Sequence, residues 1–246
     1  MKKFIGIALL TVTILTACKK ENQLLTTIPL SDYFPLTVGK YITYNLDSTL
    51  YINFGQKDTV ISYQVKDSVE NKITDNIGRP AYRIVRYIRK DASRAWAANN
   101  TFMVVPTATT IEFVENNFRF QKLKTSIKDG YSWKGNTFID TYSLNSVFKY
   151  LDDWDYTYDS VNLPSTVGAF QFPFTIKVNQ RDEFLGQDPK IPTTQYAERN
   201  FGVEKYAKGI GLVYKEFLHW EYQGAQPGRP AFYSGYGVKL TVIAHN

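Results

Sequence analysis

The chain has 246 residues, of which 43% are hydrophobic, and its 29 basic and 23 acidic residues give a formal net charge of +6 at pH 7. This length suffices for one hydrophobic core. The charges are interspersed along the chain and form no basic stripe, so the composition does not indicate nucleic-acid binding. The 18 Tyr, 16 Phe and 4 Trp residues favour half-buried pleated surfaces, which predicts β-sheet.

The first segment has the three parts of a secretory signal. Two lysines precede an apolar run from Phe4 to Leu15, and small residues follow it. A retained transmembrane span would need about 20 apolar residues, and this run is shorter. Leu15-Thr16-Ala17-Cys18 resembles the lipobox of bacterial lipoproteins, and Cys18 is the only cysteine in the chain. We therefore expect residues 1–17 to be a lipoprotein signal peptide and Cys18 to be lipidated.

The lipobox resemblance implies a diacylglyceryl thioether and an N-acyl chain on Cys18, which together anchor a protein stably. Loss of residues 1–17 would lower the formal charge from +6 to +4. No aspartate follows Cys18 directly, which under the Gram-negative sorting rule implies an outer-membrane address. Lys19-Lys20-Glu21 is similar to the surface-export tags of Bacteroidota lipoproteins. A polar tether without an export role would have a similar composition. We expect residues 18–30 to be a tether and leave the periplasmic or surface face open.

Residues 31–246 predict a single antiparallel β domain, because short aromatic-rich segments alternate with turn residues. The predicted strands cover residues 40–46, 59–65, 81–89, 111–114, 118–123, 172–178 and 236–244. We expect the first two strands to stop at Asp47-Ser48 and at Lys66-Asp67-Ser68. In the last strand, Val238, Leu240 and Val242 alternate onto one face.

Two hairpins and one helix are predicted. Residues 115–117 separate two strand patterns, and residues 208–211 separate another two, with Gly209 and Gly211 supplying the positive φ of a tight turn. The helix covers residues 143–151, where Leu144, Val147, Phe148 and Leu151 share a helical face. The aromatic content of that segment is evidence against a helix.

Three islands of the sequence resemble a group of uncharacterised Bacteroidota lipoproteins. They are Tyr33-Phe34-Pro35-Leu36…Gly39…Tyr44, Gly130-Tyr131-Ser132-Trp133-Lys134-Gly135, and the segment from Tyr206 to Glu216. The resemblance covers much of the chain in scattered pieces. It implies an all-β fold with a single antiparallel, strongly curved sheet, like the open half-barrel of outer-membrane lipoprotein carriers. A β-sandwich is the alternative fold. The resemblance to this group implies no particular activity for the chain.

Residues 152–159, Asp-Asp-Trp-Asp-Tyr-Thr-Tyr-Asp, form the stretch with the clearest chemical pattern. In an extended strand its acidic residues point one way and its aromatic residues the other. Oxygen ligands at alternate positions suggest a calcium loop. However, Tyr158 and Pro164 stand where an EF-hand needs glycine and glutamate. A solvated strand face is therefore favoured, and we expect no metal and no cofactor.

The sequence carries no catalytic motif, and we assign no catalytic residue. Its histidines are His219 and His245, and it contains neither Gly-x-Ser-x-Gly nor His-Glu-x-x-His. A triad assembled in space around His219, or a carboxylate pair for glycoside hydrolysis, stays open. A structural His219 is favoured. Gly209-Ile210-Gly211 lacks the third glycine of a dinucleotide-binding motif.

Tryptophans and Asp-Ser/Thr triplets are the other candidate contact or modification sites. Trp96, Trp133, Trp154 and Trp220 fit core positions better than sugar platforms, and Trp133 is the strongest platform candidate because glycines flank it. The triplets at 47–49, 58–60, 67–69 and 159–161 resemble Bacteroidota O-glycosylation acceptors. Such triplets also occur, without glycosylation, wherever an Asp-Ser turn precedes a strand.

These observations predict a lipid-anchored envelope protein that binds a lipid, a glycan or another envelope protein without catalysis. The alternatives are an exported hydrolase and a structural subunit of a cell-surface complex. A binding module predicts an apolar concave face, a hydrolase predicts converging carboxylates or His219 with an acid, and a subunit predicts an exposed apolar patch. The sequence specifies neither the ligand-binding residues nor the oligomeric state.

Overall fold

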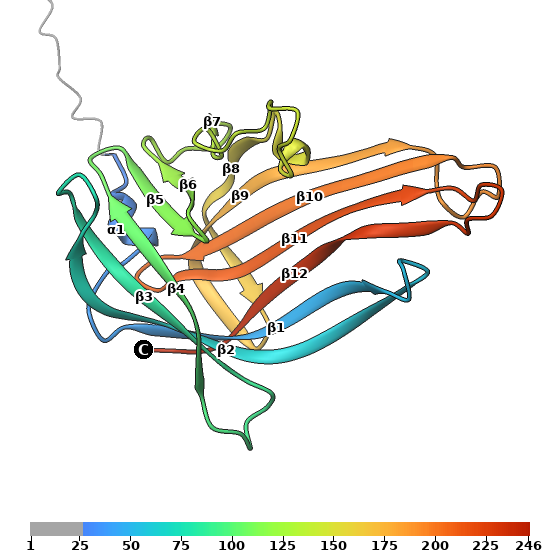
Figure 1. Ribbon diagram of the computed structural model, residues 1–246. Coiled ribbons are helices and arrows are strands. Elements are labelled where there is room, and N and C mark those ends of the chain that lie inside the picture. Colours follow the sequence, from blue (N-terminus) through green and yellow to red (C-terminus); the bar gives the residue numbers. More distant parts are fainter. Residues whose placement is uncertain (1–26) are drawn as a thin grey trace, which may run out of the picture.

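A computed structural model describes residues 27–246, which form one sheet of twelve antiparallel strands (Figure 1). The signal peptide predicted over residues 1–17 and the lipidation predicted at Cys18 lie outside the described residues. The strands are β1 (Tyr41–Ile52), β2 (Lys57–Thr74), β3 (Pro80–Arg89), β4 (Ala97–Pro106), β5 (Thr110–Glu115), β6 (Phe118–Lys124), β7 (Ser132–Lys134), β8 (Asp155–Val167), β9 (Phe170–Gly186), β10 (Tyr196–Ala207), β11 (Gly211–Gln223) and β12 (Phe232–His245).

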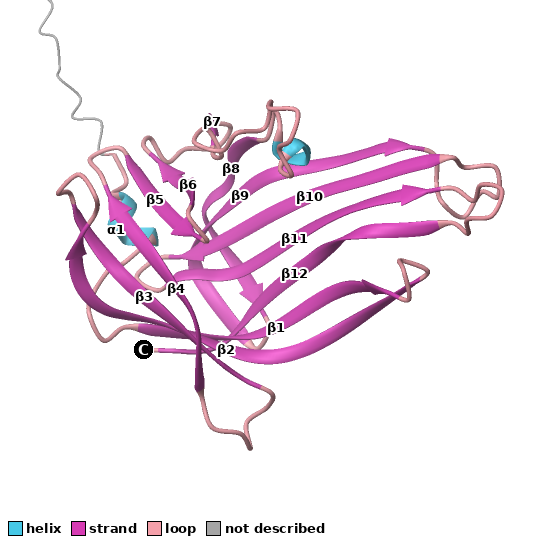
Figure 2. Cartoon of the chain, viewed as in Figure 1, coloured by secondary structure: helices cyan, strands magenta, loops and turns pink. Residues whose placement is uncertain are grey.

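Helical structure in the described part of the chain is limited to two short pieces (Figure 2). They are α1 (Leu30–Tyr33) and the 3-10 helix η1 (Lys149–Leu151). Neither piece has the length or the apolar composition that a membrane crossing requires.

The strand order is β6-β5-β4-β3-β2-β1-β12-β11-β10-β9-β8-β7. Two meanders, β1–β6 and β7–β12, are therefore joined side by side through the pairing of β1 with β12. Strands twist relative to their neighbours, so a sheet this wide curls. It closes into a nearly complete barrel shape with one open seam between β6 and β7. The predicted all-β, single, curved antiparallel sheet is confirmed, and the sandwich alternative is wrong because there is no second sheet in residues 27–246.

The seam between β6 and β7 is bridged by a few hydrogen bonds, several of them from side chains, in place of a full strand ladder. The backbone N–H of Gln121 donates to the carbonyl of Gly135 at 2.6 Å, and Nε1 of Trp133 donates to the carbonyl of Gln121 at 2.8 Å. Trp133 is only 4% exposed. The strongest sugar-platform candidate of the sequence is thus a core residue that helps to hold the seam.

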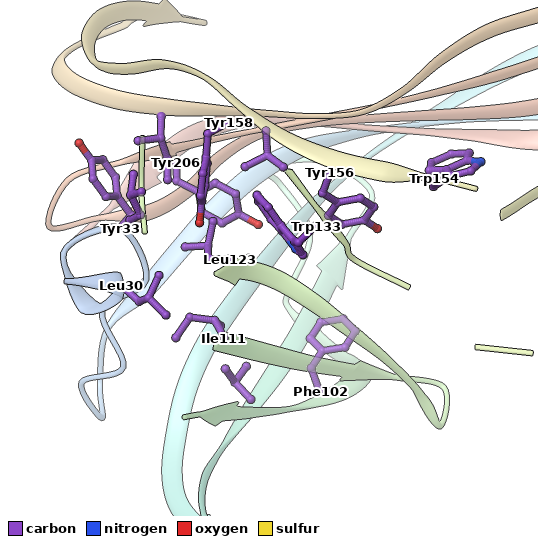
Figure 3. Close-up of a cluster of buried hydrophobic side chains, with 14 of the residues drawn as sticks. Leu30, Tyr33, Phe102, Ile111, Leu123, Trp133, Trp154, Tyr156, Tyr158 and Tyr206 are labelled. Carbon is purple, nitrogen blue, oxygen red and sulfur yellow. The ribbon is translucent and has the colours of Figure 1, made fainter. Parts of the chain in front are cut away.

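The main core cluster lies inside the curved sheet (Figure 3). On β8 the side chains of Tyr156 and Tyr158 are buried, as is Trp154 just before it, whereas Asp155 is exposed. This confirms the alternation predicted for residues 152–159. Leu30 and Tyr33 of α1 enter the same cluster, so the end of the segment expected to be a tether packs against the sheet.

Strands β1 and β2 continue past the polar residues at which they were predicted to stop. Asp67 accepts two hydrogen bonds of 2.7 Å from Arg86 on the neighbouring strand β3. Asp47 accepts a hydrogen bond of 2.6 Å from the hydroxyl of Ser62. Both carboxylates accept hydrogen bonds from residues on a neighbouring strand, so these polar side chains do not interrupt the ladder.

Both predicted hairpins are confirmed. Asn116 and Asn117 form the β5–β6 turn with φ values of 50° and 66°, and Gly209 and Gly211 in the β10–β11 turn have φ values of 75° and 112°. These are left-handed conformations, which asparagine and glycine adopt more readily than other residues.

The helix predicted over residues 143–151 is wrong, since only η1 forms there. Leu144 and Val147 are 90% and 76% exposed, so they share no buried face with Leu151. The hydroxyl of Ser146 donates a hydrogen bond to the carbonyl of Asp140 and accepts one from the backbone N–H of Phe148. Such local side-chain bonds to the backbone compete with helix formation.

The tip of the β1–β2 hairpin docks on the start of β12, and this contact can be tested with two glycines. A Cβ on Gly55 (φ +81°) would overlap the backbone of Tyr233, whereas a Cβ on Gly209 (φ +75°) would meet nothing within 4 Å. We expect Gly209→Ala to lower the free energy of unfolding by about 1–2 kcal/mol through backbone strain alone. Gly55→Ala should lower it further, as measured by urea denaturation. Equal losses would show that the hairpin tip is not docked.

Candidate functional site

The interior of the sheet holds a cavity of about 520 Å³ that is bounded by strands of both meanders. This volume falls within the range of about 300–1,000 Å³ that small-molecule sites occupy. The lining is mostly apolar and aromatic. Its apolar members include Phe34, Leu36, Ile42, Tyr44, Leu46, Ile84, Phe102, Phe113, Phe118, Phe120, Phe148, Tyr150, Trp154, Tyr156, Phe217, Tyr236, Val238 and Leu240.

One wall of the cavity is built where β1 and β12 pair. Leu46 lies opposite Leu240 and Ser48 lies opposite Val238 in the ladder. Residues opposite each other in a ladder point to the same face, and alternate residues of each strand join them there. The predicted alternation of Val238, Leu240 and Val242 is confirmed, with Val238 and Leu240 lining the cavity and Val242 buried.

The connection between β7 and β8, residues 135–154, covers part of the cavity. The ring of Phe148 packs edge-on against Phe118 of β6, with centroids 4.3 Å apart. The ring of Tyr150 stacks on His219 of β11 at 3.9 Å. The connection therefore reaches from one meander to the other, and Phe148, Tyr150 and Trp154 contribute to the cavity lining.

A buried ion pair crosses the interior. The ammonium of Lys122 on β6 lies 2.6 Å from a carboxylate oxygen of Glu204 on β10, and the hydroxyl of Tyr206 donates to the other oxygen at 2.6 Å. Burial by itself would raise the pKa of Glu204, but the charges of Lys122 and Lys215 and the hydrogen bonds outweigh it and lower that pKa. Burial would likewise lower the pKa of Lys122, but Glu204 raises it. Both groups are thus held in their charged forms.

Two further cations face the cavity in different ways. Arg86 forms a bidentate pair with Asp67 at 2.7 Å and lies over the ring of Phe102 at 4.8 Å. Lys215 on β11 lines the cavity, and its side-chain ammonium has no hydrogen bond or ion pair to any residue between 27 and 246. Burial, then the charge of Lys122, lowers the pKa of Lys215, while the charges of Glu115 and Glu204 partly oppose that shift.

His219 occupies a structural position, as favoured from the sequence. Its Nδ1 lies 2.8 Å from the amide oxygen of Asn200, and Tyr150 covers its ring. In a Ser-His-acid triad a carboxylate occupies this position and stabilises the imidazolium, whereas the amide of Asn200 carries no charge. Burial lowers the pKa of His219, and the charge of Glu198 partly opposes that shift.

The hydrolase alternative has one supporting feature, a carboxylate pair on the concave face. Glu198 lies directly opposite Glu221 in the β10–β11 ladder. Burial, together with the charge of Glu198, raises the pKa of Glu221. Glu221 lines a separate hollow of about 210 Å³ with polar residues that include Gln223 and Arg229.

The acidic residues between 152 and 159 do not converge. Asp153 and Asp155 both contact Lys134, at 3.2 and 3.3 Å, and Asp159 contacts Lys177 at 3.0 Å. Within residues 27–246, no group of three or more His, Cys, Asp and Glu side chains is placed to hold a metal ion. The carboxylates that suggested calcium therefore pair with lysines.

The remaining sequence candidates lie apart from one another. Trp96 stacks beneath Arg89 at 4.2 Å, and Trp220 packs against Tyr233 at 5.4 Å. Only Trp154 reaches the cavity. Of the glycosylation-like triplets, those at 47–49 and 67–69 place Ser48 and Asp67 in the cavity lining, whereas Asp58 is exposed.

The binding-module hypothesis predicted an apolar concave face, but sequence reasoning identified neither the residues that line the cavity nor its charges. Lys122 and Glu204 are separated by 82 residues, so no local pattern connects them. One sequence feature could have indicated these charges. Lys122 and Lys215 are charged residues at strand positions where the alternation pattern otherwise places apolar side chains toward the interior.

The sequence matches no protein-family model, and a search of curated proteins gives no match. The functional interpretation therefore depends on the geometry of the cavity.

The Lys122–Glu204 pair makes stability depend on acid pH. The folded-state pKa of Glu204 is lowered. The stability that Glu204 contributes to the folded state is therefore complete above its unfolded-state pKa of about 4.3. It is lost as the pH falls through the folded-state pKa. Urea denaturation between about pH 7 and pH 3 should give a steeper loss of stability for the wild type than for Glu204→Gln. At pH 7 the variant should be less stable by about 3–5 kcal/mol, because Lys122 is left unpaired.

The control for this comparison is Asp58→Asn, which removes an exposed carboxylate. It should follow the wild-type pH dependence closely. A Glu204→Gln curve parallel to that of the wild type would show that the pair does not couple protonation to folding.

Proposed function

We propose that the protein is a lipid-anchored, non-catalytic binding module that holds the acyl chain of an amphipathic envelope molecule in its interior cavity. The observation that carries the proposal is the apolar and aromatic lining of a 520 Å³ space inside one sheet. A space of this size that is partly open to solvent and lined by apolar side chains is typical of small-molecule binding sites.

The energy available from such a ligand is sufficient for binding. Each buried methylene group contributes about 0.8 kcal/mol, so about ten of them contribute about 8 kcal/mol. Part of this is offset by the loss of translational and rotational freedom of the ligand. The rings of Phe118, Phe148 and Phe217 lie around the space and supply contact area.

The anchor places this cavity at a membrane that contains such molecules. Lipidation of Cys18 would hold the protein at the outer membrane of a Gram-negative cell, on its periplasmic or surface face. Residues 19–29 separate the anchor from α1 and can extend about 40 Å at most. The cavity would thus remain within reach of the lipid surface.

The other roles have weaker support. Of the carboxylate pair, Glu221 lines a small polar hollow, and neither Glu198 nor Glu221 lines the apolar cavity. For a glycan ligand, the best sugar platform of the sequence, Trp133, is buried. A structural subunit should have an exposed apolar patch. The most exposed apolar residues, Phe54 and Leu144, lie on different connections between strands and do not form one patch.

Lipidation can be tested directly at Cys18. The wild-type chain expressed in a Gram-negative host should incorporate radiolabelled palmitate and fractionate with the outer membrane. Cys18→Ser should lose the label and leave that fraction, because no other cysteine can carry the thioether. Palmitate incorporation into Cys18→Ser would contradict the proposed anchor.

Filling the cavity should abolish binding. Val238 lines the cavity from β12, whereas the adjacent Lys239 is exposed on the outer face of the same strand. Val238→Trp should reduce crosslinking to a photoreactive palmitate analogue at least tenfold in the full-length protein in nonionic detergent. Lys239→Trp adds the same ring outside and should leave crosslinking unchanged. Undiminished crosslinking of a folded Val238→Trp variant would contradict the proposed site.

A further inference from the structure

The charged groups of the cavity are not balanced. Four cations, Lys40, Arg86, Lys122 and Lys215, and three anions line it. Arg86 and Lys122 have the ion-pair partners described above, and Lys40 donates to the carbonyl of Gly209 at 2.9 Å. Lys215 has no such partner within residues 27–246. One positive charge in an apolar wall is therefore available to a ligand.

The neighbours of Lys215 do not neutralise it. In the ladder it lies between Glu204 of β10 and Leu240 of β12. Glu204 is already engaged by Lys122. Glu115 also lines the cavity, but none of its oxygens lies within 4.0 Å of the Lys215 ammonium. A cation in such surroundings is costly unless an anion joins it, because the wall is apolar and most of the residue is already out of water.

We propose that Lys215 binds the anionic group of the amphiphile, a carboxylate or a phosphate, inside the cavity. The acyl chain then lies along the apolar strip that β1 and β12 provide, formed by Ile42, Leu46, Val238 and Leu240. This inference rests on the proposed function and adds to it the charge of the ligand.

The pairing explains how the cavity would select among amphiphiles. Hydrogen bonds between a charged donor and a charged acceptor are about twice as strong as neutral ones. An alcohol or a zwitterionic head group would fill the same apolar space without neutralising Lys215. Selectivity for anions then arises from one side chain, whereas the apolar wall contributes affinity for any chain.

The test measures binding of radiolabelled oleate and oleyl alcohol to the full-length protein in nonionic detergent. The two ligands share a chain and differ in charge. Wild-type protein should bind oleate at least tenfold more tightly than oleyl alcohol. Lys215→Met should remove that difference by weakening oleate alone. Lys239→Met removes the same charge from the outer face of β12 and should change neither affinity.

Additional variants and competitors sharpen this comparison. Lys215→Gln keeps a polar side chain and should behave like Lys215→Met. Glu115→Gln removes a carboxylate that repels an anionic ligand, so oleate binding should become tighter. Competition by lysophosphatidate against oleate distinguishes a phosphate head group from a carboxylate. Lysophosphatidylcholine, which is zwitterionic, should compete more weakly than lysophosphatidate.

The outcomes separate the inference from the proposed function. If wild-type protein binds oleate and oleyl alcohol equally and Lys215→Met changes neither, the cavity binds acyl chains but the role of Lys215 is overturned. If wild-type protein binds neither ligand nor the lysophospholipids, the proposed function itself fails. The ratio of the two affinities in the wild type decides the inference even if the Lys215 variants do not fold.

Discussion

The pairing of β1 with β12 is the constraint on which the rest of the structure depends. These strands come from opposite ends of the described chain, and their ladder runs from Ile42–His245 to Leu50–Tyr236. Every other strand pairs with a neighbour in sequence. Without this one ladder the chain would form two separate six-stranded meanders. With it, the inner faces of both meanders enclose a common space, and the wall of β1 and β12 forms its apolar side.

Contacts across the interior fix how the two meanders face each other. Lys122 and Glu204 connect β6 to β10, and the hydrogen bonds of Trp133 and Tyr158 join the two sides of the seam. A buried ion pair adds little net stability, because desolvation offsets much of the attraction. Its geometry is nevertheless demanding, since separating the two charges is costly. The pair therefore connects β6 to β10 at a defined distance across the interior.

The sequence could predict what depends on neighbouring residues. Alternation at Val238, Leu240 and Val242, the glycines at 209 and 211, and the aromatic face of residues 154–158 all act locally, and each was predicted correctly. Strand ends at Asp47 and Asp67 were misjudged because their partners, Ser62 and Arg86, lie on other strands. The cavity depends on the β1–β12 ladder, which joins residues about 200 apart. No pattern within a window of the chain contains that information.

The central claim is that the interior holds an amphiphile, and native mass spectrometry of the full-length protein tests it most directly. The protein would be extracted from the membrane fraction of its expression host with a mild nonionic detergent and sprayed intact. We expect a reproducible added mass, beyond the covalent lipid proposed for Cys18, that organic extraction removes and that matches a single-chain anionic lipid. A protein mass with no such extractable addition, the same before and after extraction, would contradict this expectation.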